Sequence, residues 1–293
     1  MDKIEPFINY LQHQKRYSLN TITAYKKDLE QLFDYTSSTY QITSSKEINS
    51  TIIRSWLVYL KENEQTNRTI IRKISSIKTY FKYLKKNGFV TGNPFAKIIT
   101  PKTNKPLPVF LKQEETVELF NPDLFSNNYV GVRDMIILEL FYSTGMRLSE
   151  LTSLETSSIN LSLNQIKVIG KRNNERIIPI TLNFKNKLLQ YIELKDKEFG
   201  NNKLLFLTEK GKKIYQKLVY RIVNSYLSTI TSKDKKSPHI LRHTFATHML
   251  NNGADLNTIK EILGHSNLSA TQVYTHNTIE KLKNIHKQAH PKA

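Results

Sequence analysis

The sequence predicts a two-domain, mainly α-helical protein with a small antiparallel β-sheet in its second domain. Apolar residues recur at helical spacing through the first hundred residues. A stretch with four prolines, residues 92–111, then interrupts this pattern, because proline keeps the backbone out of a regular helix. Further along, "NQIKVIGKRNNERIIPI" (residues 164–180) alternates like two strands joined by a polar turn. The length of 293 residues is sufficient for two domains.

The first domain, residues 1–91, is expected to be all-helical. Ser18 can cap its second helix, and Gly88 can end its fourth. The apolar repeats that predict its helices lie in residues 4–14, 21–36, 50–63 and 67–88.

The fourth predicted helix combines one apolar stripe with an otherwise basic surface. The stripe consists of Ile70, Ile74, Ile77, Phe81 and Leu84, and no acidic residue interrupts the cations around it. A solvated helix face usually mixes both signs of charge, so an all-positive face favours contact with the DNA backbone or groove. The predicted DNA contacts on this helix are Arg68, Arg72, Lys73, Lys78 and Lys82.

The second domain, residues 112–293, follows an expected interdomain linker over residues 92–111, with the boundary near Lys105. A buried helix should end near Gly145, and "NKLLFLT" (residues 202–208) is a candidate third strand. Further helices are expected over residues 214–229, 240–251, 255–263, 271–276 and 278–289.

Net charge indicates the class of partner. The chain carries 44 basic against 25 acidic residues, a formal net charge of +19. Both the first hundred residues and the remainder share the excess, so a basic tail does not explain it. Nucleic acid is the commonest polyanionic partner of such a surface, and the alternative is a basic protein with no such partner.

Composition also excludes several kinds of chemistry. The chain has no cysteine, which rules out disulfides, thiolate metal sites and a cysteine nucleophile. No apolar run approaches the roughly 20 residues of a membrane span, and the N-terminal stretch does not have the pattern of a signal peptide. These features predict a cytoplasmic protein.

Short segments of the second domain pair small or turn residues with unusual polar side chains. His239 and Arg242 are three residues apart and should share one helical face. The segments are "STGMRLSEL" with Arg147, "VIGKRNNERIIPI" with Lys171, "PHILRHTFATHMLNNG" with His239 and Arg242, and "GHSNLSATQVYTH" with His265 and Tyr274.

This set of side chains suits phosphoryl transfer. Arginine forks match phosphate oxygens, and a lysine on a hairpin can protonate a leaving oxygen. Histidines accept or donate protons near neutral pH, and a tyrosine hydroxyl can attack phosphorus. Positioning and charge stabilisation are the main requirements of such a reaction, so the set predicts catalysis with no metal and no other cofactor.

Each residue also has an ordinary interpretation. Arg147 could form an ion pair with Glu150, three residues further on. His239 and His243 have a spacing that metal ligands use, although Arg242 between them and the lack of nearby carboxylates oppose a metal site.

The remaining three residues are equally open to simple alternatives. Lys171 could be a turn charge, His265 could cap the preceding helix, and Tyr274 could be one of 15 tyrosines that pack. The joint occurrence of the set, rather than any single member, favours catalysis.

In this order, the segments resemble the motifs of the tyrosine recombinases, the phage-integrase-like family, and most of all its Xer (XerC and XerD) members. "NTITAYKKDLEQLFDY", "NPFAKIITPKTNKPLP" and the terminal "HKQAHPKA" agree as well, so the resemblance covers essentially the whole chain. It implies an N-terminal helical, SAM-like core-binding domain and a C-terminal α+β catalytic domain that together clamp DNA.

The resemblance also implies roles for individual residues. Tyr274 matches the nucleophile that forms a 3′-phosphotyrosyl link, and Arg147 and Arg242 match the pair that clamps the scissile phosphate. Lys171 matches the general acid for the leaving 5′-oxygen, and His239 matches the general acid/base for the tyrosine hydroxyl.

Three further positions, His265, Glu150 and Arg172, complete the comparison with the family. His265 matches a residue that hydrogen-bonds the phosphate, and Glu150 matches an acidic residue that supports the site. Arg172 stands where Xer-like sequences often have glycine, which is the one visible departure. Arg172 and Arg176 on the predicted hairpin are additional predicted DNA contacts.

The family assembles four protomers on two DNA sites, so a homo- or hetero-tetramer on double-stranded DNA is expected. The terminal helix, residues 278–289, would dock into a neighbouring protomer through Ile279, Leu282 and Ile285, or would fold back on its own domain. A DNA translocase of the FtsK type is a further expected partner.

The predicted function is site-specific DNA recombination, in the Xer role of resolving chromosome dimers during segregation. The alternatives are an integrase or transposase of a mobile element, a type IB topoisomerase-like enzyme, and a DNA-binding regulator that retains only a relic site.

Overall fold

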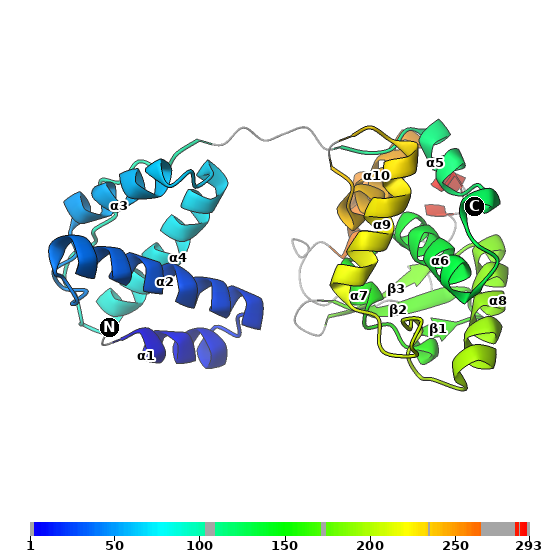
Figure 1. Cartoon of the computed structure of the whole chain (residues 1–293), viewed down its shortest axis with the longest axis horizontal. Coiled ribbons are helices and arrows are strands. Elements are labelled where there is room, and N and C mark those ends of the chain that lie inside the picture. Colours follow the sequence, from blue (N-terminus) through cyan, green and yellow to red (C-terminus); the bar gives the residue numbers. More distant parts are fainter. Residues whose placement is uncertain are drawn as a thin grey trace. The chain divides into compact units, whose positions relative to one another are not determined.

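Two separate hydrophobic cores organise the chain, one in each of the two units drawn as ribbons in Figure 1. They belong to two units, Met1–Pro106 and Leu107–Ala293. The structure is a computed structural model, and no described helix in it is long and apolar enough to cross a membrane. It describes residues 3–102, 109–170, 174–233, 235–264, 285–286 and 288–291.

Every regular element in the described part of the first unit is helical, as predicted. Ser18 caps α2 by accepting a hydrogen bond from the Thr21 backbone, and Asn49 and Thr66 cap the next two helices in the same manner. A π-helical turn, η1, continues directly from α1. The helices are α1 (Ile4–Asn9), η1 (Tyr10–Gln14), α2 (Leu19–Tyr40), α3 (Ser50–Glu62) and α4 (Asn67–Lys86).

Helix α2 packs against α1, α3 and α4, and apolar side chains of all four helices form the first core. Phe7, Phe33, Trp56 and Tyr80 are almost completely buried in it. The predicted apolar stripe of α4 is buried here in full.

The second unit is mainly helical with a small sheet, and this confirms the predicted fold class. Asn128 caps α6, and Thr181 caps α8. Its elements are α5 (Gln113–Leu119), η2 (Pro122–Leu124), α6 (Tyr129–Thr144), α7 (Leu148–Leu151), η3 (Thr156–Ser158), β1 (Ile159–Asn160), β2 (Gln165–Ile169), β3 (Glu175–Pro179), α8 (Leu182–Phe199), α9 (Gln216–Ile230), α10 (Pro238–Asn251) and α11 (Leu256–Leu263).

The sheet has the order β1-β2-β3, and both pairings are antiparallel. The predicted hairpin is present, with Ile166 opposite Ile178 and Val168 opposite Arg176. These four side chains are buried, so they face the core from the same side of the sheet.

The prediction of a third strand over residues 202–208 is wrong, because β1 takes that place at the edge of the sheet. This segment makes only isolated bridges, at Leu204 and Leu207. Its backbone is partly satisfied by side chains: the Tyr191 hydroxyl donates to the Leu205 carbonyl at 2.9 Å, and the Tyr129 hydroxyl donates to the Leu207 carbonyl at 3.0 Å.

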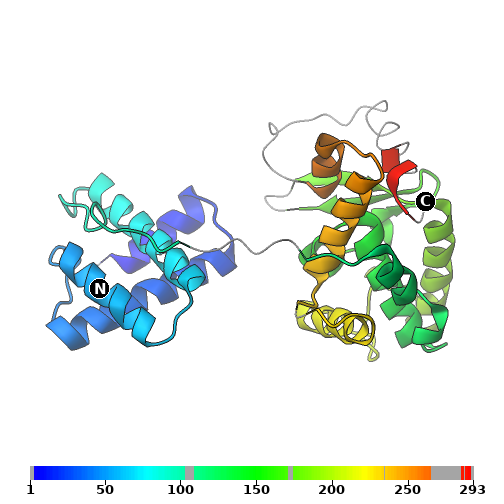
Figure 2. The ribbon, with the colours of Figure 1, turned by 90° about the horizontal axis from the view of Figure 1, so that it is seen from above.

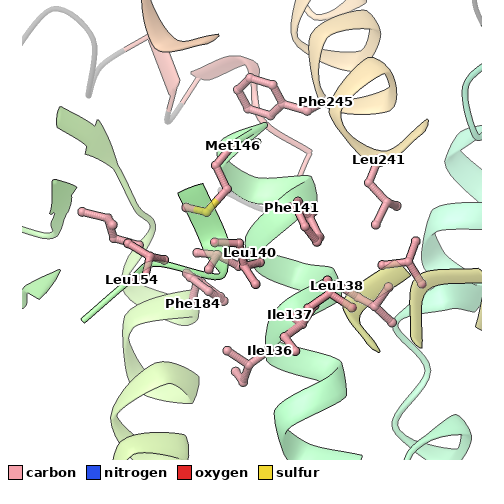
Figure 3. Close-up of a cluster of buried hydrophobic side chains, with 14 of the residues drawn as sticks. Ile136, Ile137, Leu138, Leu140, Phe141, Met146, Leu154, Phe184, Leu241 and Phe245 are labelled. Carbon is pink, nitrogen blue, oxygen red and sulfur yellow. The ribbon is translucent and has the colours of Figure 1, made fainter. Parts of the chain in front are cut away.

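Helix α6 forms the centre of the second core, between α8 and α10 (Figure 3). Ile137 and Phe141 of α6, Phe184 of α8, and Leu241 and Phe245 of α10 are among the buried side chains that meet there. Because α6 is buried on nearly all sides, the position at which it ends is held firmly.

The two cores reach into the expected linker from both sides. Phe95 is buried in the first core, and Leu111 is buried in the second. The Leu111 backbone N–H donates to the Thr244 hydroxyl of α10 at 2.9 Å.

The described C-terminal residues contact the second unit of their own chain (Figure 2). His286 Nε2 bonds the Ser143 carbonyl at 2.9 Å, and His290 Nε2 bonds the Tyr142 carbonyl at 3.2 Å. Asn252 donates to the Ala289 carbonyl at 2.8 Å. Of the expected helix over residues 278–289, residues 278–284 and 287 lie outside the described part of the chain.

Candidate active site

A sharp turn after α6 places Arg147 at the start of α7. Gly145 makes this turn with a φ of +59°, a left-handed conformation that glycine adopts without strain. A Cβ atom at this position would lie 2.6 Å from Leu263 Cδ2 and 2.7 Å from Phe245 Cδ1. Glycine is therefore required both by the backbone and by the close approach of α10 and α11.

Glu150 accepts hydrogen bonds from two arginines at the centre of the site. Its side chain is 2% exposed. Arg147 donates its backbone N–H at 2.7 Å and its Nη1 at 2.9 Å. Arg176 of β3 donates Nη1 and Nη2 to the two carboxylate oxygens at 2.7 and 2.8 Å. The ordinary alternative for Arg147, an ion pair with Glu150, is thus present, as one part of a larger network.

Competing effects determine the ionisation of Glu150. Burial acts to raise the pKa of its carboxyl, but the hydrogen bonds and charge of Arg176, together with the hydrogen bonds of Arg147, outweigh it and lower the pKa to about 2. Glu150 is therefore a carboxylate at neutral pH.

Arg242 enters the site from α10, and its side chain is largely buried. Its Nη1 donates to the Gly145 carbonyl, and its Nη2 donates to the Leu263 carbonyl at 2.8 Å. Burial lowers the pKa of the Arg242 guanidinium to about 10, and the charges of Arg147 and Arg176 act in the same direction. The group remains a cation at neutral pH.

Three arginines converge on the C-terminal end of α11. The carbonyls of Ile262 and Leu263 accept from Arg176 Nε and Arg242 Nη2, both at 2.8 Å. The Gly264 carbonyl accepts from Arg147 Nη2 at 2.9 Å. Because the last carbonyls of a helix lack intrahelical partners and carry partial negative charge, guanidinium groups are favourable there.

His239 lies in the first turn of α10, and its side chain is exposed. Arg242 is one helical turn further along the same helix. Burial lowers the pKa of the neighbouring His243, and the nearby His239 and Arg242 add to the effect. His243 is therefore expected to be neutral at pH 7, while His239 remains accessible to a ligand.

Lys171, Arg172, His265 and Tyr274 lie outside the described residues. Gly170 and Gly264, the described residues next to Lys171 and His265, border the cluster. A Cβ atom on Gly170 would be 3.4 Å from Glu150 Oε1. Gly264, which precedes His265, is bonded to Arg147.

The predicted DNA contacts on α4 separate into two groups. Arg68, Lys78 and Lys82 are exposed. Lys73 is 4% exposed, and its ammonium group donates to Asp28 Oδ1 at 3.1 Å and to Gln31. A DNA contact by Lys73 is thus corrected to a buried contact inside the helical unit.

Arg72 has an intermediate position. Its side chain is 46% exposed, but both of its terminal nitrogens bond Asp28, which is itself buried in α2. Ser76 Oγ completes this arrangement with a bond to Asp28 Oδ2 at 2.9 Å.

Arg176 also requires a correction. Its side chain is 5% exposed and bonds Glu150 and the Ile262 carbonyl, so it is not a surface DNA contact. The signal for this was present in the sequence. Arg176 and Ile178 are two residues apart in a strand, so they share a face, and that face is buried.

Comparison with known proteins identifies the family. The model described as "Phage integrase family" matches residues 110–281, and the model "Phage integrase, N-terminal SAM-like domain" matches residues 4–88. The chain belongs to the phage integrase family. The predicted resemblance to the tyrosine recombinases is thereby confirmed, and so is the N-terminal SAM-like domain.

Several relatives of this recombinase family are similar over nearly their full length. The tyrosine recombinase XerC of Bacillus pumilus is 38% identical, with 98% of this chain and 95% of that protein covered. The tyrosine recombinase XerD of Staphylococcus epidermidis is 36% identical, with 99% of both chains covered.

Solved structures agree in fold. The XerH site-specific recombinase bound to its difH substrate, in a pre-cleavage complex, has a TM-score of 0.70 at 25% identity, with 91% of this chain and 79% of that chain covered. The Tn1549 transposon integrase in complex with transposon right end DNA has a TM-score of 0.71 at 18% identity, with 96% and 98% covered. These findings make the chain a tyrosine recombinase related to XerC and XerD.

Proposed function

We propose that this recombinase cleaves and reseals double-stranded DNA at a specific site through a 3′-phosphotyrosyl intermediate, with Tyr274 as the nucleophile. The observation that carries the proposal is the convergence of Arg147, Arg176 and Arg242 at the C-terminal end of α11, where Arg147 and Arg176 also bond the carboxylate of Glu150. Among the described residues of this cluster, three cations against one anion leave an excess of two positive charges. Such an excess suits the negative charge that develops on a phosphodiester under attack.

In the proposed reaction, the Tyr274 hydroxyl oxygen attacks phosphorus and the bond from phosphorus to the 5′-oxygen breaks. Lys171 gives a proton to the leaving 5′-oxygen, and His239 takes the proton of the tyrosine hydroxyl. Arg147 and Arg242 hold the phosphate oxygens. A phenol has an ordinary pKa near 10, so its attack at neutral pH depends on this assistance.

The remaining proposed roles concern the phosphate and the reverse step. His265 donates a hydrogen bond to a phosphate oxygen. In resealing, a 5′-hydroxyl attacks the phosphotyrosyl link and releases Tyr274. The link conserves the energy of the broken backbone bond, so the strand is resealed without ATP.

DNA binding is proposed to use the basic surfaces of both units. Arg68, Lys78, Lys82 and the exposed part of Arg72 are the proposed phosphate contacts of the first unit, and Arg172 is one of the second. We place four copies on two sites, as a homo- or hetero-tetramer, with a DNA translocase of the FtsK type as activator. The relatives named XerC and XerD support a role in resolving chromosome dimers.

Covalent capture tests the chemistry. The purified protein is incubated with nicked duplex fragments of the source genome, and adducts are separated on a denaturing gel and sequenced. The wild type should form an adduct, Tyr274→Phe should form none while it still retards DNA, and Tyr220→Phe should behave as the wild type. Tyr220 is the matched control because it is a half-exposed tyrosine on α9 of the same unit.

The same experiment discriminates among the alternatives. Adduct formation should persist in EDTA, because arginines, lysine and histidines supply the positioning and proton transfer. A Tyr274→Phe protein that still forms the adduct would overturn the assignment. Capture of one chromosomal site supports dimer resolution, whereas capture of the ends of an integrated element supports a mobile-element integrase.

A further inference from the structure

Arg176 occupies an unusual position for a charged side chain. It lies within β3 on the buried face of the sheet, opposite Val168 and two residues before Ile178. Burial of an arginine is costly unless every charge and donor finds a partner. Here the partners are Glu150 and the Ile262 carbonyl at the end of α11.

Arg176 and Arg147 engage the same carboxylate in different ways. Arg176 forms two parallel bonds, one to each oxygen of Glu150, at 2.7 and 2.8 Å. Arg147 makes one side-chain bond to that carboxylate, at 2.9 Å, and its side chain remains 36% exposed. A guanidinium has five N–H donors, and the contacts of Arg147 within the described part of the chain use two of them.

Charge counting shows what would follow without Arg176. Glu150 would then be a buried carboxylate whose bonded side-chain partner is Arg147. The positive charge of Arg147 would be offset by the negative charge of Glu150. Within the described part of the chain, the remaining cation of the cluster would be Arg242, which is itself largely buried. With Arg176 present, Glu150 is already compensated by a residue that cannot reach DNA.

We propose that Arg176 is a positioning residue that neutralises Glu150, so that the charge and the exposed edge of Arg147 stay available to the scissile phosphate. Glu150 in turn orients Arg147 by accepting both its backbone N–H and its Nη1. Arg176 thus acts through Glu150 and does not touch the substrate. This inference rests on the proposed phosphodiester cleavage.

A competing role for Arg176 is purely mechanical. Its Nε bond to the Ile262 carbonyl ties β3 to the end of α11. A Cβ atom at Gly264 would lie 3.0 Å from Arg176 Cδ, so the packing between the two segments is close. Loss of this tether would reduce activity independently of the charge on Glu150.

A double-mutant cycle separates the two roles. We would measure the single-turnover rate of adduct formation on the captured nicked duplex, and DNA affinity by gel shift, for Arg176→Gln, Glu150→Gln and the double variant. Arg176→Gln should slow cleavage by roughly 10- to 100-fold, in the range seen when supporting residues of a site are removed, with DNA affinity within about threefold of the wild type. The double variant should cleave faster than Arg176→Gln and about as fast as Glu150→Gln, because the uncompensated carboxylate has gone.

Two further variants control for loss of stability. Arg133→Gln also removes a buried arginine that binds a carboxylate, Asp134, and a backbone carbonyl, Leu207, near the other end of α6. It should retain near wild-type cleavage at a temperature at which it is folded. Arg176→Lys keeps the charge but not the paired bonds, and it should cleave faster than Arg176→Gln.

The outcomes distinguish this inference from the proposed function. A wild type that forms no adduct overturns both. An active wild type with Arg176→Gln cleaving at the wild-type rate overturns the role of Arg176 alone. If the losses of cleavage rate multiply in the double variant, the mechanical tether is indicated and charge compensation is overturned. The same conclusion follows if Arg176→Lys is folded but cleaves no faster than Arg176→Gln.

Discussion

At the scale of single residues, the site depends on a glycine as much as on its charged groups. Gly145 allows α6 to end and the chain to turn into α7, which begins after Arg147. It also allows side chains of α10 and α11 to approach the turn closely. Its carbonyl also accepts a bond from Arg242. One residue without a side chain therefore links the two proposed phosphate ligands.

Gly145→Ala should destabilise the second unit and slow cleavage. A left-handed alanine costs about 1–2 kcal/mol, and overpacking against Leu263 and Phe245 adds about 1–3 kcal/mol. Gly253→Ala is the matched control, because Gly253 has a φ of +88° with nothing within 4 Å of the added Cβ. Urea unfolding of both variants should give the smaller loss for Gly253→Ala; equal losses would contradict the close-approach argument.

At the scale of elements, α4 uses neighbouring cations for different purposes. Lys73 points into the first unit and compensates the buried Asp28, whereas Arg68 and Lys82 face solvent. An acidic residue on α2 thus determines which cations of α4 remain available to DNA.

Substitution of these cations should separate stability from DNA affinity. Lys82→Gln should change the free energy of unfolding by no more than about 0.5 kcal/mol from the wild-type value. It should reduce the magnitude of the slope of log affinity against log salt concentration by about one unit. Lys73→Gln should cost about 1–3 kcal/mol, because Asp28 loses a buried charged partner. The measurements are urea unfolding and DNA binding across salt concentrations, and an unchanged salt slope for Lys82→Gln would exclude it from the phosphate contacts.

At the scale of the whole molecule, the C-terminal end of the chain contacts the segment that leads into the site. His286 and His290 stack at 4.9 Å and bond the last carbonyls of α6. Burial lowers the pKa of His286, although its bond to the Ser143 carbonyl partly opposes the effect. Burial likewise lowers the pKa of His248, which bonds Tyr142 and the Leu111 carbonyl.

His286 and His248 predict a dependence of stability on pH. Their pKa in the folded state lies below the ordinary value of 6.5, so the unfolded chain binds protons first as pH falls. The stabilisation is complete above pH 6.5 and decreases below it, by at most about 1.4 kcal/mol per pH unit for each histidine. His286→Gln keeps a hydrogen-bond donor for the Ser143 carbonyl but does not titrate. Its free energy of unfolding, measured in urea between pH 7.5 and 5.5, should therefore fall less steeply as the pH is lowered than that of the wild type. An identical slope would contradict the prediction; Glu150, with a pKa of about 2, does not titrate in this range.

Local patterns predicted most of the elements because the determinants of a helix or hairpin are close in sequence. The predicted fourth helix, residues 67–88, corresponds to α4, Asn67–Lys86, since its apolar spacing and caps are local. The third strand was predicted wrongly over residues 202–208. Hydroxyls of Tyr129 and Tyr191, distant in sequence, satisfy carbonyls there that a sheet ladder would otherwise use.

The sequence by itself determined the helical character, the hairpin, the basic surface and the set of residues that resembles a recombinase site. Tertiary structure alone decided which charged residues are free for DNA and which are buried with a partner. Lys73 meets Asp28 and Arg176 meets Glu150 only after folding brings different elements together. The physical reason is that a cation's role depends on its desolvation and on the nearest opposite charge, and both are properties of position in space.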